Sequence, residues 1–83
     1  MVSAADKQTM LVRRLIGTAV EAIGALPPRA RPGALQRAGE AYRQLIAREW
    51  SHLSPSELKR LETAFVEAVA ERIRATQQEQ AAR

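Results

Sequence analysis

Three stretches of the chain repeat apolar residues at the three- to four-residue spacing of an α-helix. In the first and third stretches the apolar face covers about half of the helix circumference, at about 100° per residue. The pattern predicts an all-α fold, a small three-helix bundle made of a helical hairpin plus a third helix and completed by dimerisation. The expected segments of this single helical domain, 1–83, are helices at about 5–26, 34–50 and 55–76, a proline-rich connector at 27–33 and a polar tail at 77–83.

The first helix is expected to end before Pro27, because proline lacks a backbone donor and restricts the residue that precedes it. Its wide apolar face consists of Leu11, Leu15, Ile16, Ala19, Val20, Ile23 and Leu26. Gly17 and Gly24 lie off this face, one heptad apart. Either another helix backbone approaches closely there, or the two glycines are tolerated at a cost of up to about 1 kcal/mol each.

The connector is expected to be stiff and extended because it begins with two prolines, and Gly33 permits the turn into the second helix. The apolar side of that helix holds Leu35, Ala38, Tyr42, Leu45, Ile46 and Trp50. Arg37 and Arg48 share another side and form a short basic stripe. Glu40 can pair with Arg37 or Arg43, which neutralises part of this stripe.

The start of the third helix carries the most specific local signal. Ser54 is a capping residue, Pro55 occupies the first helical position, and Glu57 follows the cap by three residues. Leu53 and Leu58 occupy the positions of a hydrophobic staple, so the corner should be tight and the second and third helices should be neighbours. The apolar face of the third helix holds Leu58, Leu61, Ala64, Phe65, Val66, Ala68, Val69 and Ile73. The polar tail beyond it is expected to fray.

The small size of the chain favours self-association. It has 83 residues, no cysteine and one histidine, so disulfides and a Cys/His zinc site cannot stabilise it within one subunit. We therefore expect a homodimer, in which Leu15, Ile16, Phe65 and Val69 hold the core or the dimer interface. The alternative is a monomeric three-helix bundle whose surplus apolar residues are mostly alanine.

The charges indicate an anionic partner. Lys and Arg number 13 against 9 Asp and Glu, and 11 of the cations are arginine, which suits planar contacts to carboxylate or phosphate. The predicted partner-binding residues are the five arginines between the first and third helices: Arg29, Arg31, Arg37, Arg43 and Arg48. We expect a small non-enzymatic interaction or regulatory protein that dimerises and binds an acidic protein surface through this arginine-rich face.

The alternative is a DNA- or RNA-binding regulator. The second helix, the corner and the third helix can be read as a helix-turn-helix, with Ser56, Lys59, Arg60 and Thr63 on the leading turns. The glutamates interleaved along the third helix would meet phosphate unfavourably. Backbone binding through the arginines that precede the corner is therefore the second form of this alternative.

The sequence contains no convincing set of residues for catalysis or for binding a cofactor, so we expect neither an enzyme nor a cofactor. Glu49 and His52 have the Glu-x-x-His spacing of carboxylate di-iron bundles, but the first helix offers no inward-facing carboxylate to complete the ligands. We therefore expect no metal site. Glu67 and Glu71 lie four residues apart and are read as part of a solvated charged face.

We expect a soluble cytoplasmic protein without a membrane partner. Arg13 and Arg14 precede an apolar run as in a twin-arginine leader, but Glu21 interrupts the run and Pro27 suits a helix end better. The uncharged stretches are far shorter than the roughly 20 residues that a bilayer requires.

The order of several segments resembles one known family. Leu15–Gly17 is followed by Leu26–Pro28, by an arginine-bearing helix through Tyr42 and Arg43, and by a long third helix. This order is similar to that of small helical antiactivators of the TraM type. The resemblance implies a protein that inactivates a quorum-sensing transcription factor through helical contacts, and it assigns no binding residues here.

Overall fold

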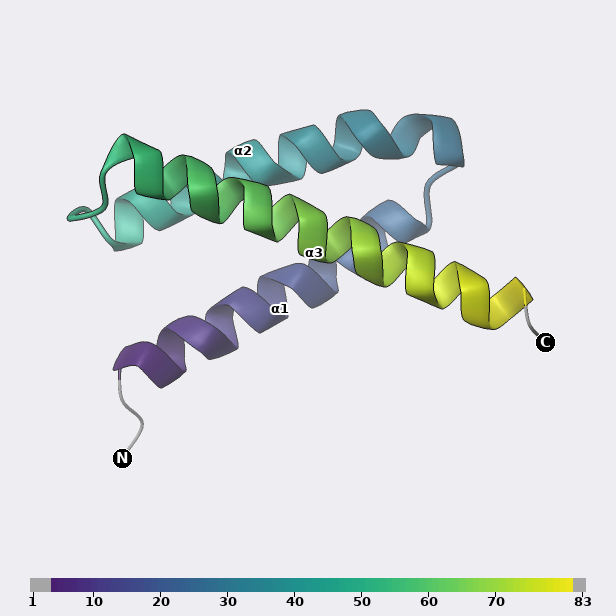
Figure 1. Ribbon diagram of the computed structural model, residues 1–83, viewed down its shortest axis with the longest axis horizontal. Helices are drawn as coiled ribbons and strands as arrows, with labels where there is room; N and C mark the ends of the chain where they lie inside the picture. The colour runs from purple at the N-terminus through teal and green to yellow at the C-terminus, as the bar shows by residue number, and fades with distance from the viewer. Residues whose placement is uncertain (1–3, 82–83) are drawn as a thin grey trace.

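The computed structural model describes residues 4–81 and is helical through most of that range (Figure 1). Helix α1 spans Ala4–Gly24, the short 3-10 helix η1 spans Pro28–Ala30, α2 spans Arg31–Glu49 and α3 spans Pro55–Ala81. No strand occurs within the described range, which confirms the predicted all-α fold. Residues 1–3 and 82–83, including the end of the predicted polar tail, lie outside the described residues.

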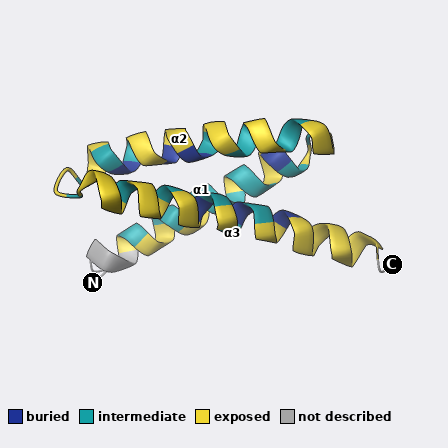
Figure 2. Ribbon diagram, turned by 45° about the horizontal axis from the view of Figure 1, so that its top comes forward, coloured by how far each residue is buried: buried dark blue, intermediate teal, exposed yellow. Residues whose placement is uncertain are grey.

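Helix α3 organises the other two helices. It lies beside α2 and runs in the opposite direction, while α1 crosses it obliquely (Figures 1 and 2). Both α1 and α2 pack more extensively on α3 than on each other. The space between α1 and α2 is therefore the least filled part of the bundle.

The corner between α2 and α3 follows the sequence signal. The hydroxyl of Ser54 accepts a hydrogen bond from the backbone N–H of Glu57 at 3.2 Å, and Pro55 is the first residue of α3. The cap satisfies one of the backbone donors that a helix start leaves unpaired. The predicted start of the third helix, and its position next to the second, are confirmed.

The hydrophobic core is small. Its buried side chains are Ile23, Tyr42, Ile46, Phe65, Val69 and Ile73. Phe65 and Val69, named from the sequence as core or dimer residues, lie in this cluster, whereas Leu15 and Ile16 are half-buried and pack against it. In Figure 2 the buried positions line the inner sides of the helices, and the C-terminal turns of α3 extend past them.

The proline-rich connector is shorter than predicted. Only the stretch around Pro27 is extended, since Pro28 opens η1 and Arg31 already begins α2. Pro32 sits in the first turn of α2, where its missing N–H would have no helical partner in any case. The prediction of an extended connector is therefore wrong from Pro28 onwards, because prolines at helix starts favour helix.

The third helix is longer than predicted. It continues to Ala81, so the predicted helix end near residue 76 is wrong, and the polar tail predicted at 77–83 is helical as far as the structure describes it. The sequence from Thr76 onwards contains glutamine, glutamate and alanine and no glycine or proline, and these residue types have good helix propensity. Propensity sustains the helix there without burial, because the side chains from Thr76 to Ala81 are exposed.

Gly39, and not the pair in the first helix, marks a close helix approach. A Cβ placed on Gly39 would lie 2.7 Å from Cγ2 of Val66 and 3.3 Å from Cγ of Glu62. Gly17 has nothing within 4 Å of such an atom, and Gly24 has only an ordinary contact with Ile73 at 3.9 Å. Gly17 is thus tolerated in α1, while Gly39 allows α2 and α3 to pack closely.

Candidate protein-binding groove

An apolar groove of about 260 Å³ lies between α1 and α2. Its α1 side is lined by Leu15, Thr18, Ala19, Ala22 and Ile23. Its α2 side is lined by Ala34, Ala38, Ala41, Tyr42 and Leu45. Phe65 of α3 also lines it, so the groove is closed from below by the core and open on the side away from α3. None of the lining residues is charged.

Alanine spacing explains why the groove stays open. Ala34, Ala38, Ala41 and Leu45 follow one another at helical spacing on α2, next to the core stripe that contains Tyr42. Three of these four side chains are single methyl groups, so they cannot fill the space towards α1. The helical pattern placed Ala38 and Leu45 on an apolar side but was not read as containing this second stripe. The four-, three- and four-residue spacing was the signal that could have revealed it.

Exposed arginines border the groove on its α2 edge. Arg37 and Arg48 are exposed and eleven residues apart, about three helical turns, so they share one side of α2. That side adjoins the alanine stripe, since about 40° of helix rotation separates Arg37 from Ala41 and about 20° separates Arg48 from Ala41. The groove therefore combines an apolar interior with a basic margin.

The α1 edge is also polar and carries a cation. Arg14 is exposed and lies one turn before Thr18, which lines the groove. The Thr18 hydroxyl donates a hydrogen bond to the backbone carbonyl of Arg14 at 3.0 Å, which fixes the side chain against its own helix. Glu21, seven residues after Arg14 and also exposed, shares this side of α1, so the α1 edge carries both charges and the basic margin belongs to α2.

The five predicted partner-binding arginines occupy different environments. Arg29, Arg37 and Arg48 are exposed. Arg43 is also exposed, and it lies 3.5 Å from Glu62 of α3 in an ion pair between two helices, and not in the predicted pairing with Glu40. The Arg31 guanidinium donates hydrogen bonds to backbone carbonyls of the same chain. The five arginines therefore do not form one continuous face.

The Arg31 side chain forms hydrogen bonds that stabilise the connection between α1 and α2. Its Nε and one terminal nitrogen donate hydrogen bonds of 3.1 Å to the carbonyls of Leu26 and Gly24. In the amide orientation that satisfies both side chains, Gln77 of α3 also accepts hydrogen bonds from this guanidinium. The half-buried Arg31 thus satisfies carbonyls at the end of α1, where a helix leaves them unpaired and favours a cation.

A second, smaller cleft of about 160 Å³ lies where α1 meets the corner between α2 and α3. It is lined by Gln8, Val12, Tyr42, Ile46, Trp50, His52, Leu53 and Leu61. His52 and Glu49 are both exposed. Among residues 4–81, no three His, Cys, Asp or Glu side chains come together in a way that could hold a metal ion.

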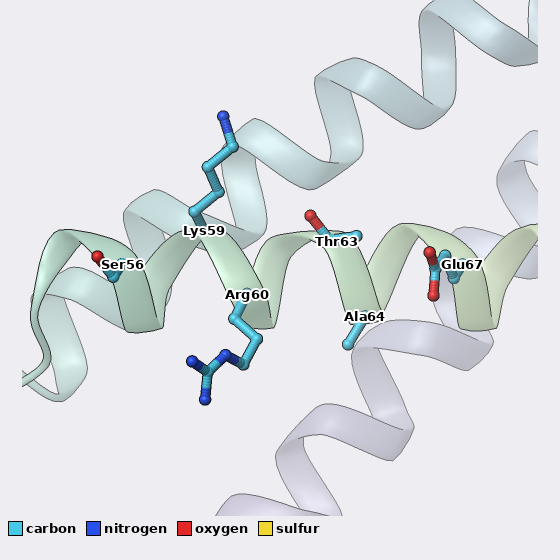
Figure 3. Close-up of a pocket in the computed structure, with 6 residues that line it drawn as sticks. All are labelled: Ser56, Lys59, Arg60, Thr63, Ala64 and Glu67. Carbon is cyan, nitrogen blue, oxygen red and sulfur yellow. The ribbon is translucent and has the colours of Figure 1, made fainter.

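The residues proposed for a helix-turn-helix lie on a single exposed helix face. Ser56, Lys59, Arg60 and Thr63 border a shallow surface together with Ala64 and Glu67, all from α3 (Figure 3). Lys59 and Arg60 leave the helix in opposite directions. The two cations consequently do not converge on one point.

Burial also affects the one titratable group at the bottom of the groove. Desolvation of the Tyr42 hydroxyl raises its pKa above the ordinary value of 10.0. Since the ordinary value already lies well above neutral pH, the side chain is neutral at physiological pH and the groove interior is uncharged.

Comparisons of the chain with protein-family models, curated proteins and solved structures find no significant match. No helix within residues 4–81 is long and apolar enough to span a membrane. What the protein binds has to be inferred from its own surfaces.

Proposed function

We propose that this chain is a non-enzymatic helical interaction protein that binds an acidic surface of a protein partner. The observation that carries the proposal is the uncharged apolar groove between α1 and α2, bordered by exposed Arg37 and Arg48. An apolar interior with a charged margin is the usual anatomy of a protein interface. Arg29, exposed in η1, adds a cation at the connected end of the two groove-forming helices.

Self-association is the second part of this proposal. Six buried side chains form the core, while Met10 is 59% exposed and Leu61 is 37% exposed. A homodimer that covered such residues would gain about 25 cal/mol for each Å² of apolar surface removed from water. Absolute mass from light scattering on a sizing column tests this part: a dimer mass supports it, and a monomer mass at all concentrations overturns it.

Nucleic-acid binding is the second candidate, and the exposure of Ser56, Lys59, Arg60 and Thr63 on α3 favours it. Two observations count against a helix-turn-helix. Glu67 shares the same surface, and α2 runs alongside α3 in Figure 1 where the motif has its helices at about 90–120°. Adding a short DNA duplex at low salt to the mass measurement separates the two candidates, because phosphate contacts weaken as salt rises.

The arginine margin is tested by charge reversal. We expect the wild-type chain to retain a partner protein from an extract of the cells that produce the chain. The double variant Arg37→Glu/Arg48→Glu should no longer retain that protein. The matched control is Arg72→Glu/Arg74→Glu, which makes the same charge change at two exposed positions of α3. Circular dichroism establishes that both double variants remain helical.

Two results are decisive. A protein retained by the wild type and by the α3 control, but lost by Arg37→Glu/Arg48→Glu, supports the proposal. Equal retention by all three chains, or retention of nucleic acid in place of protein, overturns it.

A further inference from the structure

We propose that the groove between α1 and α2 receives one amphipathic α-helix of a partner protein, with an apolar stripe and acidic residues flanking that stripe. This inference rests on the proposed function and names the part of the partner that is recognised. The bound helix would take the fourth position of a four-helix bundle.

The arrangement of the helices leaves that position open. In a four-helix bundle each helix packs against two neighbours around a shared core. Here α3 contacts both α1 and α2 closely, while α1 and α2 contact each other much less. The groove lies between these two helices on the side away from α3, and the buried core residues Ile23, Tyr42 and Phe65 form its base. A fourth helix would cover the partly exposed lining above them, which includes Leu15, Ala38 and Leu45.

The lining suits a helix better than an extended chain or a small polar ligand. The α2 stripe from Ala34 to Leu45 is about 16 Å long, which matches about three turns of a bound helix. Alanine methyl groups let a helix backbone approach closely, and the larger side chains of the incoming stripe would fill the space they leave. The lining offers one hydroxyl, that of Thr18, besides the Tyr42 phenol, so it could not satisfy the backbone of an extended peptide.

The charge of the groove margin selects acidic flanks on the bound helix. Arg37 and Arg48 border the α2 side, Arg14 and Glu21 share one exposed side of α1, and the lining itself carries no charge. Acidic residues beside the apolar stripe of the bound helix would meet Arg37 and Arg48 at the partly exposed α2 margin, where charge complementarity steers association and sets orientation.

The same charges disfavour a second copy as the occupant. Two copies related by a twofold axis through the groove would bring the same patch of each subunit together. Arg37 and Arg48 of both subunits would then surround one small interface and repel one another. A DNA duplex is also disfavoured as the occupant of the groove. The groove interior is apolar, so only its margin offers hydrogen-bond donors to phosphates.

The test uses a synthetic peptide of about 20 residues, long enough to form helix on binding. It carries leucine and alanine on one face and glutamate on both flanks, and a second peptide replaces the glutamates with lysine. Binding is measured by isothermal titration calorimetry against the full chain. We expect saturable one-to-one binding of the glutamate peptide, at least tenfold weaker binding of the lysine peptide, and an affinity that falls as salt rises.

A blocking variant tests the location. Ala41 is exposed and lines the groove, so Ala41→Trp should obstruct it and reduce peptide affinity at least tenfold. Ala75→Trp is the matched control at an exposed position of α3 outside the groove, and it should bind as the wild type does. Circular dichroism of both variants verifies the helical content before binding is compared.

The outcomes separate this inference from the proposed function. If the glutamate peptide does not bind, or if Ala41→Trp leaves its affinity unchanged, the inference that the groove receives a partner helix is overturned. The proposed function still stands in that case if capture of a protein depends on Arg37 and Arg48. If that capture fails as well, both are overturned. A dimer mass that Ala41→Trp converts to a monomer, while Ala75→Trp does not, would assign the groove to a second copy and overturn the partner helix.

Discussion

The ring of Tyr42 in α2 stacks on the ring of Phe65 in α3, with centroids 4.2 Å apart and planes only 7° from parallel. Both side chains are buried and both reach the base of the groove between α1 and α2. Stacked aromatic pairs contribute about 0.5–1.5 kcal/mol beyond their buried area. The pair therefore joins the two helices that pack most closely and also forms part of the candidate binding surface.

Alkaline unfolding should report on the Tyr42 hydroxyl. Its pKa is raised by desolvation in the folded chain, so the unfolded state loses this proton first as pH increases. The contribution is fully present below the ordinary pKa of 10.0 and is lost as pH rises from there through the raised folded value. The free energy of unfolding should therefore fall more steeply above about pH 10 in the wild type than in Tyr42→Phe.

Urea denaturation across this pH range measures the difference between the two chains, and the comparison cancels the titration of all other groups that they share. Tyr42 is the single tyrosine of the sequence, so the ultraviolet absorption of tyrosinate follows the same ionisation directly. Parallel stability curves for wild type and Tyr42→Phe would show that the hydroxyl is not desolvated.

Gly39→Ala should destabilise the protein even though alanine is the better helix former. The new Cβ would lie 2.7 Å from Cγ2 of Val66, whose branched side chain is stiff and cannot move aside easily. Overpacking of this kind costs about 1–3 kcal/mol, which exceeds the gain of about 1 kcal/mol in helix propensity. Thermal unfolding should show a lower Tm for the variant.

Gly17→Ala is the matched control for Gly39→Ala, because open space surrounds that position. It should raise stability by up to about 1 kcal/mol, which is about 4–8 °C in Tm for a domain of this size. In a Val66→Ala background the penalty of Gly39→Ala should largely disappear. A penalty that persists there would place the strain elsewhere.

The glycines show why the sequence predicted the helices better than their contacts. Apolar spacing and the Ser54 cap are local signals, and they located three helices and the start of α3 correctly. Which glycine closely faces side chains of a neighbouring helix depends on how α2 and α3 cross, and the residues around Gly39 do not encode that crossing by themselves. The sequence left open whether Gly17 and Gly24 mark a close approach or are merely tolerated, and the structure places the close approach at Gly39.

The candidate site was predictable only in part, for the same reason. The arginine stripe with Arg37 and Arg48 follows from helical spacing alone. The use of Arg31 to satisfy carbonyls of α1, and of Arg43 to pair with Glu62, depends on how the chain turns between helices. The groove depends on the weak contact between α1 and α2, although the alanine spacing from Ala34 indicated its α2 wall.

Ser54→Ala should cost about 1 kcal/mol of stability. The Ser54 hydroxyl accepts the bond from the N–H of Glu57, and alanine at a helix N-cap leaves such a donor without a protein partner. Ser56→Ala, two residues further on in the first turn of α3, is the control. It should be neutral or slightly stabilising, since alanine has the higher helix propensity. Equal losses in urea denaturation would show that the cap contributes nothing specific.

Arg31→Ala should destabilise the chain by about 1–2 kcal/mol, because it removes charged hydrogen bonds to the carbonyls of Gly24 and Leu26 in a half-buried setting. Arg31→Lys keeps the charge near the end of α1 but loses the planar fork, so it should recover only part of the loss. The measurement is urea denaturation at neutral pH.

Arg29→Ala is the control for Arg31→Ala. It distinguishes the loss of the Arg31 hydrogen bonds from the general effect of removing a positive charge from the segment between α1 and α2. Arg29 is exposed in η1, and its removal should change stability by no more than about 0.5 kcal/mol. If Arg31→Ala were as mild as Arg29→Ala, the carbonyls of α1 would be equally well satisfied by water. Arg31 would then be available for a partner, as the sequence first suggested.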